Sequence, residues 1–352
     1  MAKQVENWGA NRKWNENVKR AVLADVVPLA TPYVAYIDPA NACNFRCKFC
    51  PTGHPELLRK IQRPTGVMDF NLFKKIINDF KLFPEKLRVL FLHKDGEPLL
   101  NPRIGDMMAL AKRSEIAPVV WLTTNGALIT HERAIEIIES GIDYVRLSVE
   151  HVTAEGYLDF TKTYSNYDGL RRNIDFLFNE KNRRGSHLKI WAKMIDFNFT
   201  EDELKKFGED FGGIADEVLL TGTGVWTDQM GIDFNLGANP QAGYDGATPM
   251  KKNRIVCPYT FYNIAINFDG TTGGCMLDWS HSLVAGDART QSIVDIWTSP
   301  AMNRVRLAHL EGRRKEFLSC NGCQCVQFMP ADNELDDVRE KLIPMFKDEG
   351  KS

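Results

Sequence analysis

Three cysteines stand close together near the start of the chain: Cys43, Cys47 and Cys50. Thiolate sulfur is a soft ligand that selects zinc, copper(I) or iron–sulfur clusters. A zinc site normally takes a fourth protein ligand, whereas a [4Fe–4S] cube held by only three cysteines leaves one iron free to bind a small molecule. The fold must therefore present this segment, the cysteine triad, as a loop whose thiols converge on one inorganic core. A zinc knuckle or a set of buried thiols is the alternative.

The spacing C-x3-C-x2-C, with Phe49 directly before the last cysteine, resembles the signature of the radical S-adenosylmethionine (SAM) superfamily. The resemblance implies that the triad holds a [4Fe–4S] cluster whose free iron chelates the amino and carboxylate groups of SAM. It also implies cleavage of SAM to a 5′-deoxyadenosyl radical, which removes a hydrogen atom from the substrate. Phe49 is then a neighbour of the cofactor.

Composition and charge exclude several classes of protein. The 352 residues are 43% hydrophobic, enough for one large or two modest domains. A net charge of −2, from 44 basic and 46 acidic residues without long runs, argues against nucleic-acid and membrane-surface binding. No apolar run approaches a membrane span and no signal peptide is evident, so we expect a cytoplasmic protein. In that compartment, eight cysteines indicate metal binding or catalysis rather than disulfides.

Strand-like and helical patterns alternate over residues 32–221. We expect strands at 32–37, 88–92, 119–123, 144–148, 188–195 and 217–221, and helices at 69–80, 104–112, 131–140, 170–181 and 201–211. This order predicts an α/β fold with a parallel sheet and right-handed crossovers. The resemblance implies the same architecture, a partial (β/α)6 TIM-like barrel, whose ligands sit at the carboxyl ends of the strands.

Four further segments flank this barrel. We expect a helical lead-in at 1–31, a loop-rich bridge at 222–256, a small β-hairpin-plus-helix iron–sulfur domain at 257–330, and a C-terminal helix and tail at 331–352. The dipeptide Asp269-Gly270 marks the hairpin turn, and the final helix is expected over 332–347.

The candidate SAM contacts follow the strands. Gly96 and Glu97 resemble the end of the glycine–glycine–glutamate motif of radical SAM proteins, whose backbone accepts hydrogen bonds from the SAM ammonium; Asp95 replaces the first glycine. An ordinary glycine turn before a proline is the alternative. Asn125, in a Thr-Thr-Asn-Gly turn, is similar to the third-strand sequence of the family.

Three more polar residues are candidates at the fourth and fifth strands. Ser148 and Glu150 suit the ribose hydroxyls of SAM, although a capped strand end with a solvated glutamate is the alternative. Lys193 lies on an apolar strand, where burial of a lysine is costly unless it is paired. Lys193 therefore either faces solvent or points into the barrel, where it would meet the SAM carboxylate or a substrate hydroxyl.

A second cysteine group lies near the C-terminus and consists of Cys257, Cys275, Cys320 and Cys323, here named the auxiliary quartet. Its spacing resembles the twitch and SPASM extensions of radical SAM enzymes, in particular that of 2-deoxy-scyllo-inosamine dehydrogenases of aminoglycoside biosynthesis. The resemblance implies a second [4Fe–4S] cluster with all four corners ligated. A four-cysteine zinc site is the alternative.

One thiol, Cys325, is left over. It is an inert thiol, a ligand that exchanges with Cys323, or a hydrogen-atom donor to a substrate radical. Asp278 and His281 follow Cys275 closely enough to reach a substrate, but we expect surface positions for both.

The resemblance implies an enzyme that oxidises a secondary alcohol of a sugar, aminocyclitol or polyol, with the auxiliary cluster accepting an electron. It would need a one-electron reductant such as flavodoxin or ferredoxin. The alternatives are an epimerase that uses Cys325 as hydrogen donor, a peptide- or protein-modifying enzyme, and a non-catalytic iron–sulfur electron carrier. The about 30 residues before the first strand are short for a leader-binding domain, which weighs against peptide modification.

Overall fold

The computed structural model describes residues 21–223, 228–229, 231–238 and 249–347. Most of the helical lead-in expected at 1–31 lies outside the described residues; the described part holds helix α2 (Leu23–Val26). The bridge expected at 222–256 is described in part and contains a two-stranded hairpin of β7 (Asp228–Gln229) and β8 (Ile232–Asp233).

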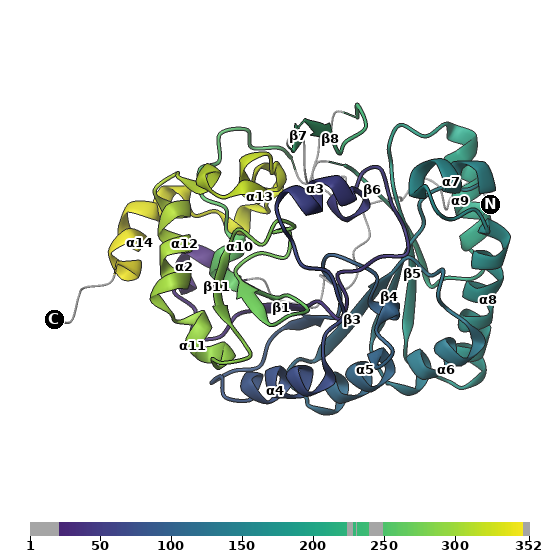
Figure 1. Cartoon of the computed structure of the whole chain (residues 1–352), viewed down its shortest axis with the longest axis horizontal. Helices are drawn as coiled ribbons and strands as arrows, with labels where there is room; N and C mark the ends of the chain where they lie inside the picture. The colour runs from purple at the N-terminus through teal and green to yellow at the C-terminus, as the bar shows by residue number, and fades with distance from the viewer. Residues whose placement is uncertain (1–20, 224–227, 230, 239–248, 348–352) are drawn as a thin grey trace.

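One curved sheet organises the described chain (Figure 1). Its strands are β1 (Val34–Ile37), β2 (Val89–Phe91), β3 (Val119–Thr124), β4 (Tyr144–Ser148), β5 (Lys189–Ile195), β6 (Glu217–Thr221), β9 (Asn263–Ile266), β10 (Thr271–Gly273) and β11 (Val284–Asp287). Strands β1 to β6 are neighbours in chain order and all parallel. The predicted partial barrel of six parallel strands is therefore confirmed.

The sheet does not stop at the barrel. Strand β9 pairs in parallel with β1, with Val34 opposite Asn263 and Ile37 opposite Ile266, and β10 and β11 continue the sheet in antiparallel pairs. The turn between β9 and β10 carries Gly270 at φ +91°, the left-handed conformation that the Asp-Gly pair predicts. The cysteine-rich C-terminal part is thus joined to the barrel through main-chain hydrogen bonds.

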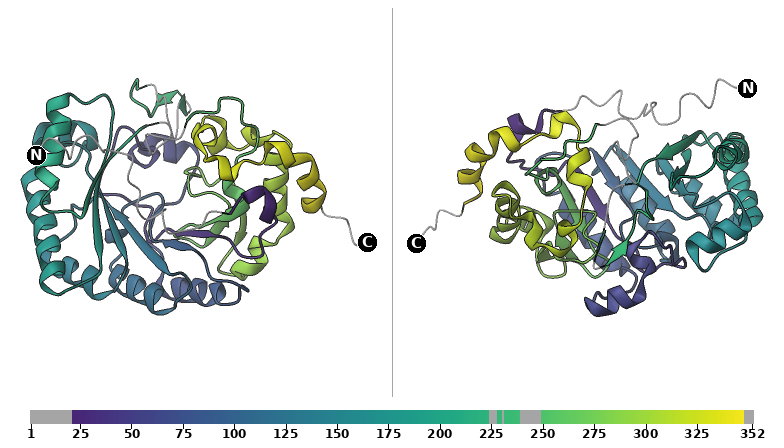
Figure 2. Two further views of the ribbon diagram at one scale, coloured as in Figure 1. Left: turned by 180° about the vertical axis from the view of Figure 1, so that it is seen from behind. Right: turned by 90° about the horizontal axis from the view of Figure 1, so that it is seen from above.

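Helices cover the outer side of the sheet, as Figures 1 and 2 show. In the barrel they are α4 (Phe70–Phe80), α5 (Ile104–Arg113), α6 (His131–Glu139), α7 (Ala154–Thr161), α8 (Tyr167–Arg183) and α9 (Glu201–Phe211). The short helix α3 (Pro55–Lys60), which follows the cysteine triad, is not among them, and its Leu57 packs with Phe234 and Trp279. The first of the long helices, α4, begins where predicted, because the Asp69 carboxylate accepts hydrogen bonds from the N–H groups of Asn71 and Leu72. Its buried face, with Phe73 and Ile77, packs into the core.

The remaining helices surround the auxiliary quartet and the chain end. They are α10 (Tyr259–Tyr262), α11 (Ile293–Trp297), α12 (Pro300–Leu310), α13 (Leu318–Asn321) and α14 (Arg339–Phe346). The final helix is shorter than the one expected over 332–347, because the segment before Arg339 forms two short 3-10 turns, Ala331–Asn333 and Asp336–Val338, rather than α-helix. The prediction also missed α7, which Thr153 caps.

Inward-facing side chains form layers inside the barrel. Residues paired across parallel strands point to the same side of a sheet, so the pairs Tyr36–Phe91 and Trp121–Tyr144 share the inner face. Each pair stacks with ring centroids 4.5 Å apart, and Trp191 packs against the second pair. The barrel interior therefore has an aromatic floor, and the residues two positions further along each strand form the next layer.

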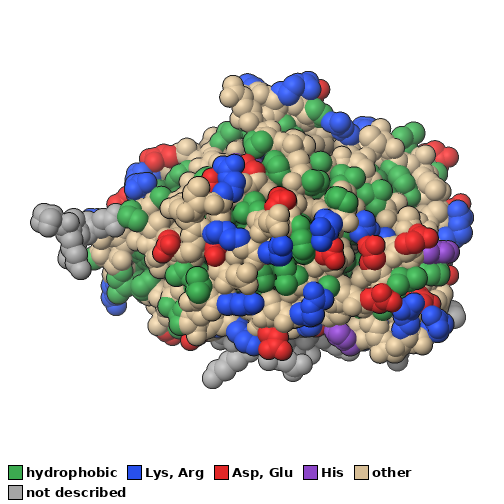
Figure 3. Space-filling model, turned by 60° about the horizontal axis from the view of Figure 1, so that its bottom comes forward, with side chains coloured by type: hydrophobic (Ala, Val, Ile, Leu, Met, Phe, Trp, Pro, Cys, Tyr) green, Lys and Arg blue, Asp and Glu red, His purple; other side chains and the backbone are tan. Residues whose placement is uncertain are grey.

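The surface is mixed in charge. On the face drawn in Figure 3, Lys and Arg side chains are interspersed with Asp and Glu. Within the described residues, none of the helices combines the length and apolar composition that crossing a membrane requires.

Candidate active site and auxiliary cysteine site

A large cavity of about 1180 Å³ occupies the barrel and is lined by residues at both the amino and the carboxyl ends of its strands. The cysteine triad and every predicted SAM or catalytic residue line it: Phe49, Gly96, Glu97, Asn125, Ser148, Glu150, Lys193 and Cys325. The structure thus brings to one cavity residues from six separate segments of the chain. The auxiliary quartet lies outside this cavity.

The triad forms a tight loop after β1. The Cys50 N–H donates to the Cys47 carbonyl over 3.1 Å, and the Gly53 N–H donates to the Cys50 carbonyl over 2.8 Å. A side chain at Gly53 would collide with the backbone of Cys47, so only glycine lets the chain close this loop. The three thiols are therefore held in place by backbone geometry.

The electrostatics of the triad fit a cationic inorganic core. Burial raises the pKa of Cys43 to about 12 and the pKa of Cys47 well above its usual value. The carboxylates of Glu97 and Glu150 act in the same direction, Glu97 on Cys43 and Glu150 on both cysteines. Three buried thiolates beside carboxylates need several positive charges nearby. Three sulfur donors at the edge of a large cavity would hold an iron–sulfur cluster with one position left for a ligand.

The loop after β2 packs directly on the triad loop. A side chain at Gly96 would collide with the carbonyl oxygens of Ala40 and Ala42, and the Glu97 N–H donates to the Ala42 carbonyl over 2.9 Å. The space that glycine leaves here is thus filled by the backbone of the chain itself. Gly96 fixes the two loops against each other, which places the predicted SAM contacts beside the thiols.

Glu97 is anchored by three donors of the protein. Its carboxylate accepts hydrogen bonds from the Thr124 hydroxyl at 2.7 Å, the Asn125 N–H at 2.8 Å and the Leu99 N–H at 2.9 Å. Burial raises its pKa to about 7, although these hydrogen bonds act to lower it. The Asn125 side chain donates to the Asn44 carbonyl oxygen Oδ1 at 2.8 Å. The third-strand turn is therefore tied to both the Glu97 loop and the triad loop.

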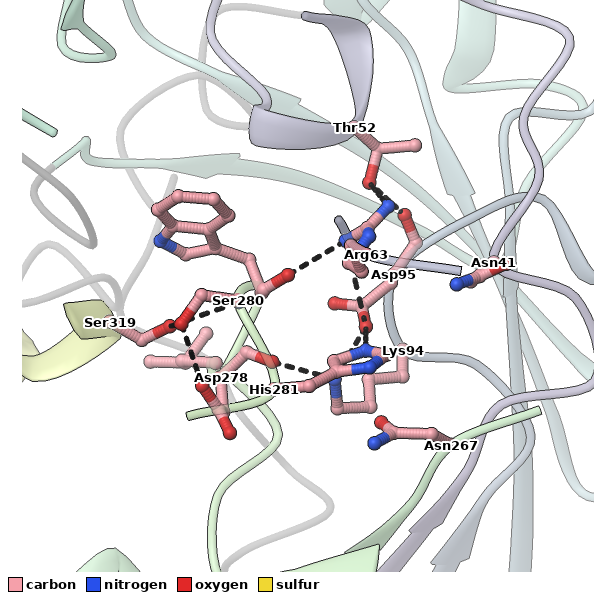
Figure 4. Close-up of polar contacts among 12 residues, drawn as sticks. Asn41, Thr52, Arg63, Lys94, Asp95, Asn267, Asp278, Ser280, His281 and Ser319 are labelled. Atoms are coloured by element: carbon pink, nitrogen blue, oxygen red, sulfur yellow. Dashed lines mark hydrogen bonds and ion pairs between the residues drawn. The ribbon is translucent and has the colours of Figure 1, made fainter. Parts of the chain in front are cut away.

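Asp95, the departure from the glycine motif, is the centre of a buried ion network (Figure 4). Its side chain is 5% exposed, and Oδ2 lies 2.5 Å from Lys94 Nζ, 3.0 Å from His281 Nε2 and 3.8 Å from Arg63 Nη1. Burial acts to raise the pKa of Asp95, but the charge of Lys94, the His281 hydrogen bond and the charge of Arg63 together lower it. Asp95 is therefore an ionised anchor for three basic groups.

The same network reaches the auxiliary segment. Lys94 Nζ donates to the Asp278 carbonyl at 3.0 Å, and Arg63 Nη1 donates to the Trp279 carbonyl at 2.9 Å (Figure 4). The Asp278 carboxylate accepts from the N–H groups of Ser282 and Leu283. The expected surface positions of Asp278 and His281 are thus wrong, because Asp278 is 4% exposed and the His281 side chain 9%. They join the loop after Cys275 to the barrel.

Ser148, Glu150 and Lys193 occupy the far wall of the cavity. Ser148 and Lys193 are register partners on β4 and β5, and Lys193 is buried with its side chain toward the cavity rather than solvent. Burial raises the pKa of Glu150 to about 7, and Lys193 acts in the opposite direction. Phe49 lines the cavity and packs against Phe197 with ring centroids 4.9 Å apart.

The auxiliary quartet surrounds a second, much smaller cavity, lined by all four of its thiols. The four residues come from the segments before α10, after β10 and at α13, so folding alone brings them together. No three His, Cys, Asp or Glu side chains in the described part of the chain meet closely enough to bind a single metal ion. A donor set of four thiolates around a cavity fits a fully ligated iron–sulfur cluster.

Two neighbours of the quartet were not predicted from the sequence. Arg314 Nη1 donates to the Cys320 carbonyl at 2.7 Å, and His309 Nε2 lies 3.9 Å from Cys320 Sγ. Burial lowers the pKa of His309 to about 4, so its imidazole is neutral at pH 7. A lone histidine on a helix carries no signal in the sequence that would have identified this position.

Cys325 lies in the wall between the two cavities and faces the large one. Its Sγ is 3.8 Å from the Tyr259 hydroxyl, and burial raises the pKa of its thiol well above the usual value. Cys325 does not line the small cavity, whereas Tyr259 and Leu277 line both. Cys325 is therefore a neighbour of the quartet, close to Cys323 and Cys257, whose thiol lines the large cavity.

Comparison with known proteins identifies two matched regions. Residues 37–191 match the model of the radical SAM superfamily, and residues 257–324 match SPASM, an iron–sulfur cluster-binding domain. A tungsten-containing aldehyde ferredoxin oxidoreductase cofactor-modifying protein of Pyrococcus furiosus is 36% identical over 115 residues, which are 33% of this chain and 30% of that protein. Matches to the curated relatives cover 25% to 41% of their length.

Solved structures show the same fold at low identity. BtrN in complex with AdoMet and 2-DOIA is 17% identical, with a TM-score of 0.52 over 85% of this chain and 95% of that one. SuiB of Streptococcus suis bound to precursor peptide SuiA is 12% identical, with a TM-score of 0.62 over 81% of this chain and 69% of that one. The family implies iron–sulfur clusters and SAM as cofactors. With its triad loop, its parallel barrel and its second cysteine site, this chain contains a radical SAM domain followed by a C-terminal SPASM domain.

Proposed function

We propose that this protein is a SAM-dependent dehydrogenase that oxidises a secondary alcohol of a sugar, aminocyclitol or related polyol to a ketone. The proposal includes two [4Fe–4S] clusters, one on the triad and one on the auxiliary quartet. It also includes a one-electron donor such as flavodoxin or ferredoxin, and the reducing cytoplasm as its location. BtrN, whose structure was solved with AdoMet and 2-DOIA, supports the substrate class by analogy of fold.

One observation carries the proposal: the large cavity and the quartet cavity share a wall. Tyr259 and Leu277 line both cavities, so only side chains separate a substrate in the barrel from the auxiliary thiols. A cluster at this place has the position that an electron acceptor needs. The volume of the large cavity, about 1180 Å³, exceeds that of a usual single-ligand site and suits a cofactor together with a small substrate.

The reaction balances with these parts. Bound SAM and its cluster would supply, after uptake of one external electron, the group that removes one hydrogen atom from the substrate. Oxidation of an alcohol to a ketone releases two protons and two electrons. One of each leaves as the hydrogen atom, the second proton leaves the hydroxyl, and the second electron passes to the auxiliary site. Glu150, whose carboxylate lines the cavity, is the group that we propose to receive the hydroxyl proton.

A specific observation favours epimerisation as the second candidate function. The Cys325 thiol lies at the wall of the large cavity, beside the Tyr259 hydroxyl and outside the quartet. A thiol there could return a hydrogen atom to a substrate radical, which would leave the substrate oxidation state unchanged. Modification of a peptide or protein is the third candidate, and SuiB, bound to its precursor peptide, shares the fold.

The test is anaerobic reconstitution followed by product analysis. We expect about eight irons per chain, release of 5′-deoxyadenosine with SAM and reductant, and a ketone from a polyol in equal amount. A polyol epimer without a ketone would favour the second candidate. Failure of SAM cleavage with bound zinc would contradict the whole proposal.

A further inference from the structure

A polar layer lies directly above the aromatic floor of the barrel. It consists of His93, Thr123 and Arg146, which stand two residues beyond Phe91, Trp121 and Tyr144 on three neighbouring strands. Thr123 and Arg146 are register partners, and the Thr123 hydroxyl lies 3.2 Å from His93 Nε2. All three line the large cavity.

Arg146 is a basic group of the cavity that has neither an ion pair nor an aromatic ring contact among the described residues. Within the same part of the chain, its Nε is buried without a hydrogen-bond partner. By contrast, Lys94 is paired with Asp95, and Arg88 lies over the Tyr33 ring, 3.5 Å from its centroid. A partly buried guanidinium without an acceptor is costly for a folded protein, which indicates that something else supplies the acceptor.

The charges around Arg146 show what kind of group that is. Lys193 follows Trp191, the register partner of Arg146, by two residues on the same face of β5, so a second cation stands nearby. Burial, and then the charges of Arg146 and Lys193, lower the pKa of His93 well below its usual value, so His93 is neutral. The carboxylate of Glu97 acts on the thiol of Cys43, and that of Glu150 on Cys43 and Cys47 and also on Lys193. The groups that face Arg146 itself, His93 and Thr123, carry no negative charge.

We propose that Arg146 binds an oxyanion of the substrate, a carboxylate or a phosphate, above the aromatic floor. This inference rests on the proposed function and narrows its substrate class to acidic sugars or polyols. An amine at the same place would meet Arg146 and Lys193 as like charges, which disfavours an aminocyclitol. The planar guanidinium suits two-point binding of either oxyanion, with the Thr123 hydroxyl as a further donor.

The test uses the reconstituted protein saturated with SAM and without reductant, so that no turnover occurs. Calorimetric titrations compare glucose, glucosamine, glucuronate and glucose 6-phosphate, which share one ring and differ in charge. We expect at least one of the two anions to bind roughly 10- to 100-fold more tightly than glucose, and glucosamine to bind no better than glucose. The two anionic ligands distinguish a carboxylate from a phosphate.

Arg146→Gln should reduce this preference to within about twofold, with SAM affinity unchanged. Arg88→Gln, which removes a cation from the opposite end of the same cavity, should keep the preference. The thermal midpoint of Arg146→Gln without ligand should equal or exceed that of the parent, because an unpaired charge is removed. If this variant does not fold, Arg146→Lys can be used, which keeps the positive charge but loses the two-point geometry of the guanidinium. It should retain part of the preference for anions.

Three results would overturn the inference: no anion preference in the parent protein, an unchanged preference in Arg146→Gln, or a loss of SAM affinity in that variant while the sugar preference remains. The last result would assign Arg146 to the SAM carboxylate. If the anions bind as expected but reductant then yields no ketone, the oxidation proposed above fails and the oxyanion site stands.

Discussion

The two cysteine sites differ in how they are built. The triad comes from one loop and lines a large cavity, so a cluster there would have one position open to a ligand. The quartet comes from three segments, 66 residues apart between Cys257 and Cys323, and closes around a small cavity that buries its thiols. An open site can bind and activate a ligand, whereas a closed one can only accept electrons or hold the fold together. The two sites therefore suit the two different roles that we propose for them.

Removal of the triad should have the largest effect on activity. The variant Cys43→Ala/Cys47→Ala/Cys50→Ala should release 5′-deoxyadenosine at background level, at least about a thousandfold below the parent. Its fold should persist, since the loop is held by backbone hydrogen bonds rather than by the thiols. Product chromatography and circular dichroism measure both outcomes. Unfolding of this variant would mean that the triad is structural after all.

Removal of the quartet should instead weaken the C-terminal part of the fold and leave some SAM cleavage. Cys257→Ala/Cys320→Ala should lower the iron content from about eight to about four, abolish ketone formation and leave some SAM cleavage. Because the quartet joins three separate segments, limited proteolysis should cut the C-terminal part faster than in the triad variant. Equal protease resistance of the two variants would remove the distinction between the sites.

Loss of the Asp95 ion network should have a smaller effect than loss of either cysteine site, but it should still remove a large fraction of the free energy of unfolding. Asp95→Asn leaves Lys94, Arg63 and His281 without their buried counter-ion, and we expect a loss of about 3 kcal/mol in the free energy of unfolding. Asp159→Asn, which removes the partner of Lys48 at the surface, should cost no more than about 1 kcal/mol. Anaerobic chemical denaturation gives both values. Similar losses in the two variants would contradict a stabilising role for the buried Asp95 network.

Asp38, unlike the Asp95 ion network, should make the stability of the protein depend on pH. Asp38 follows β1, and neither of its carboxylate oxygens has a hydrogen-bond partner among the described residues. Burial and then the charge of Asp95 raise its pKa from 3.8 to about 7. The folded state therefore binds this proton more tightly than the unfolded state, so stability falls between about pH 4 and pH 7 and is constant above. Asp38→Asn should raise the thermal midpoint by a few degrees at pH 8 and progressively less toward pH 5.

The smallest change is expected at Cys325. Cys325→Ser should leave the iron content unchanged and alter the free energy of unfolding by less than about 1 kcal/mol, because Cys325 lies outside the quartet cavity. Loss of about four irons would instead identify it as a ligand. If ketone formation persists in this variant, the thiol is not needed for the reaction.

Local patterns predicted the barrel well. The strands and helices of residues 32–221 follow hydrophobic periodicity and capping residues such as Asp69, which act over a few neighbours. The helix α7 was missed because Gly156 interrupts a short apolar pattern, yet its lack of a side chain is what lets His151 pack there. The triad was predicted for the same reason as the helices, since its ligands are adjacent in the chain.

Interactions between distant residues could not be predicted in this way. Asp95 departs from the glycine motif and therefore weakened the resemblance, but its partners Arg63 and His281 are 32 and 186 residues away. Arg146 gave no signal because a single arginine in an alternating strand is typical of a solvent-facing position. The pairing of β9 with β1 was hidden too, as it joins segments more than two hundred residues apart.

That strand pairing has a consequence for electron transfer. The rate of electron tunnelling falls steeply with distance, so a two-cluster enzyme whose domains swung on a hinge would transfer charge at fluctuating rates. Here β1, which leads into the triad, and β9, which follows the first quartet cysteine, are hydrogen-bonded neighbours in one sheet. In the proposed enzyme, this main-chain pairing would hold the barrel, with its substrate, at a fixed distance from an acceptor on the quartet.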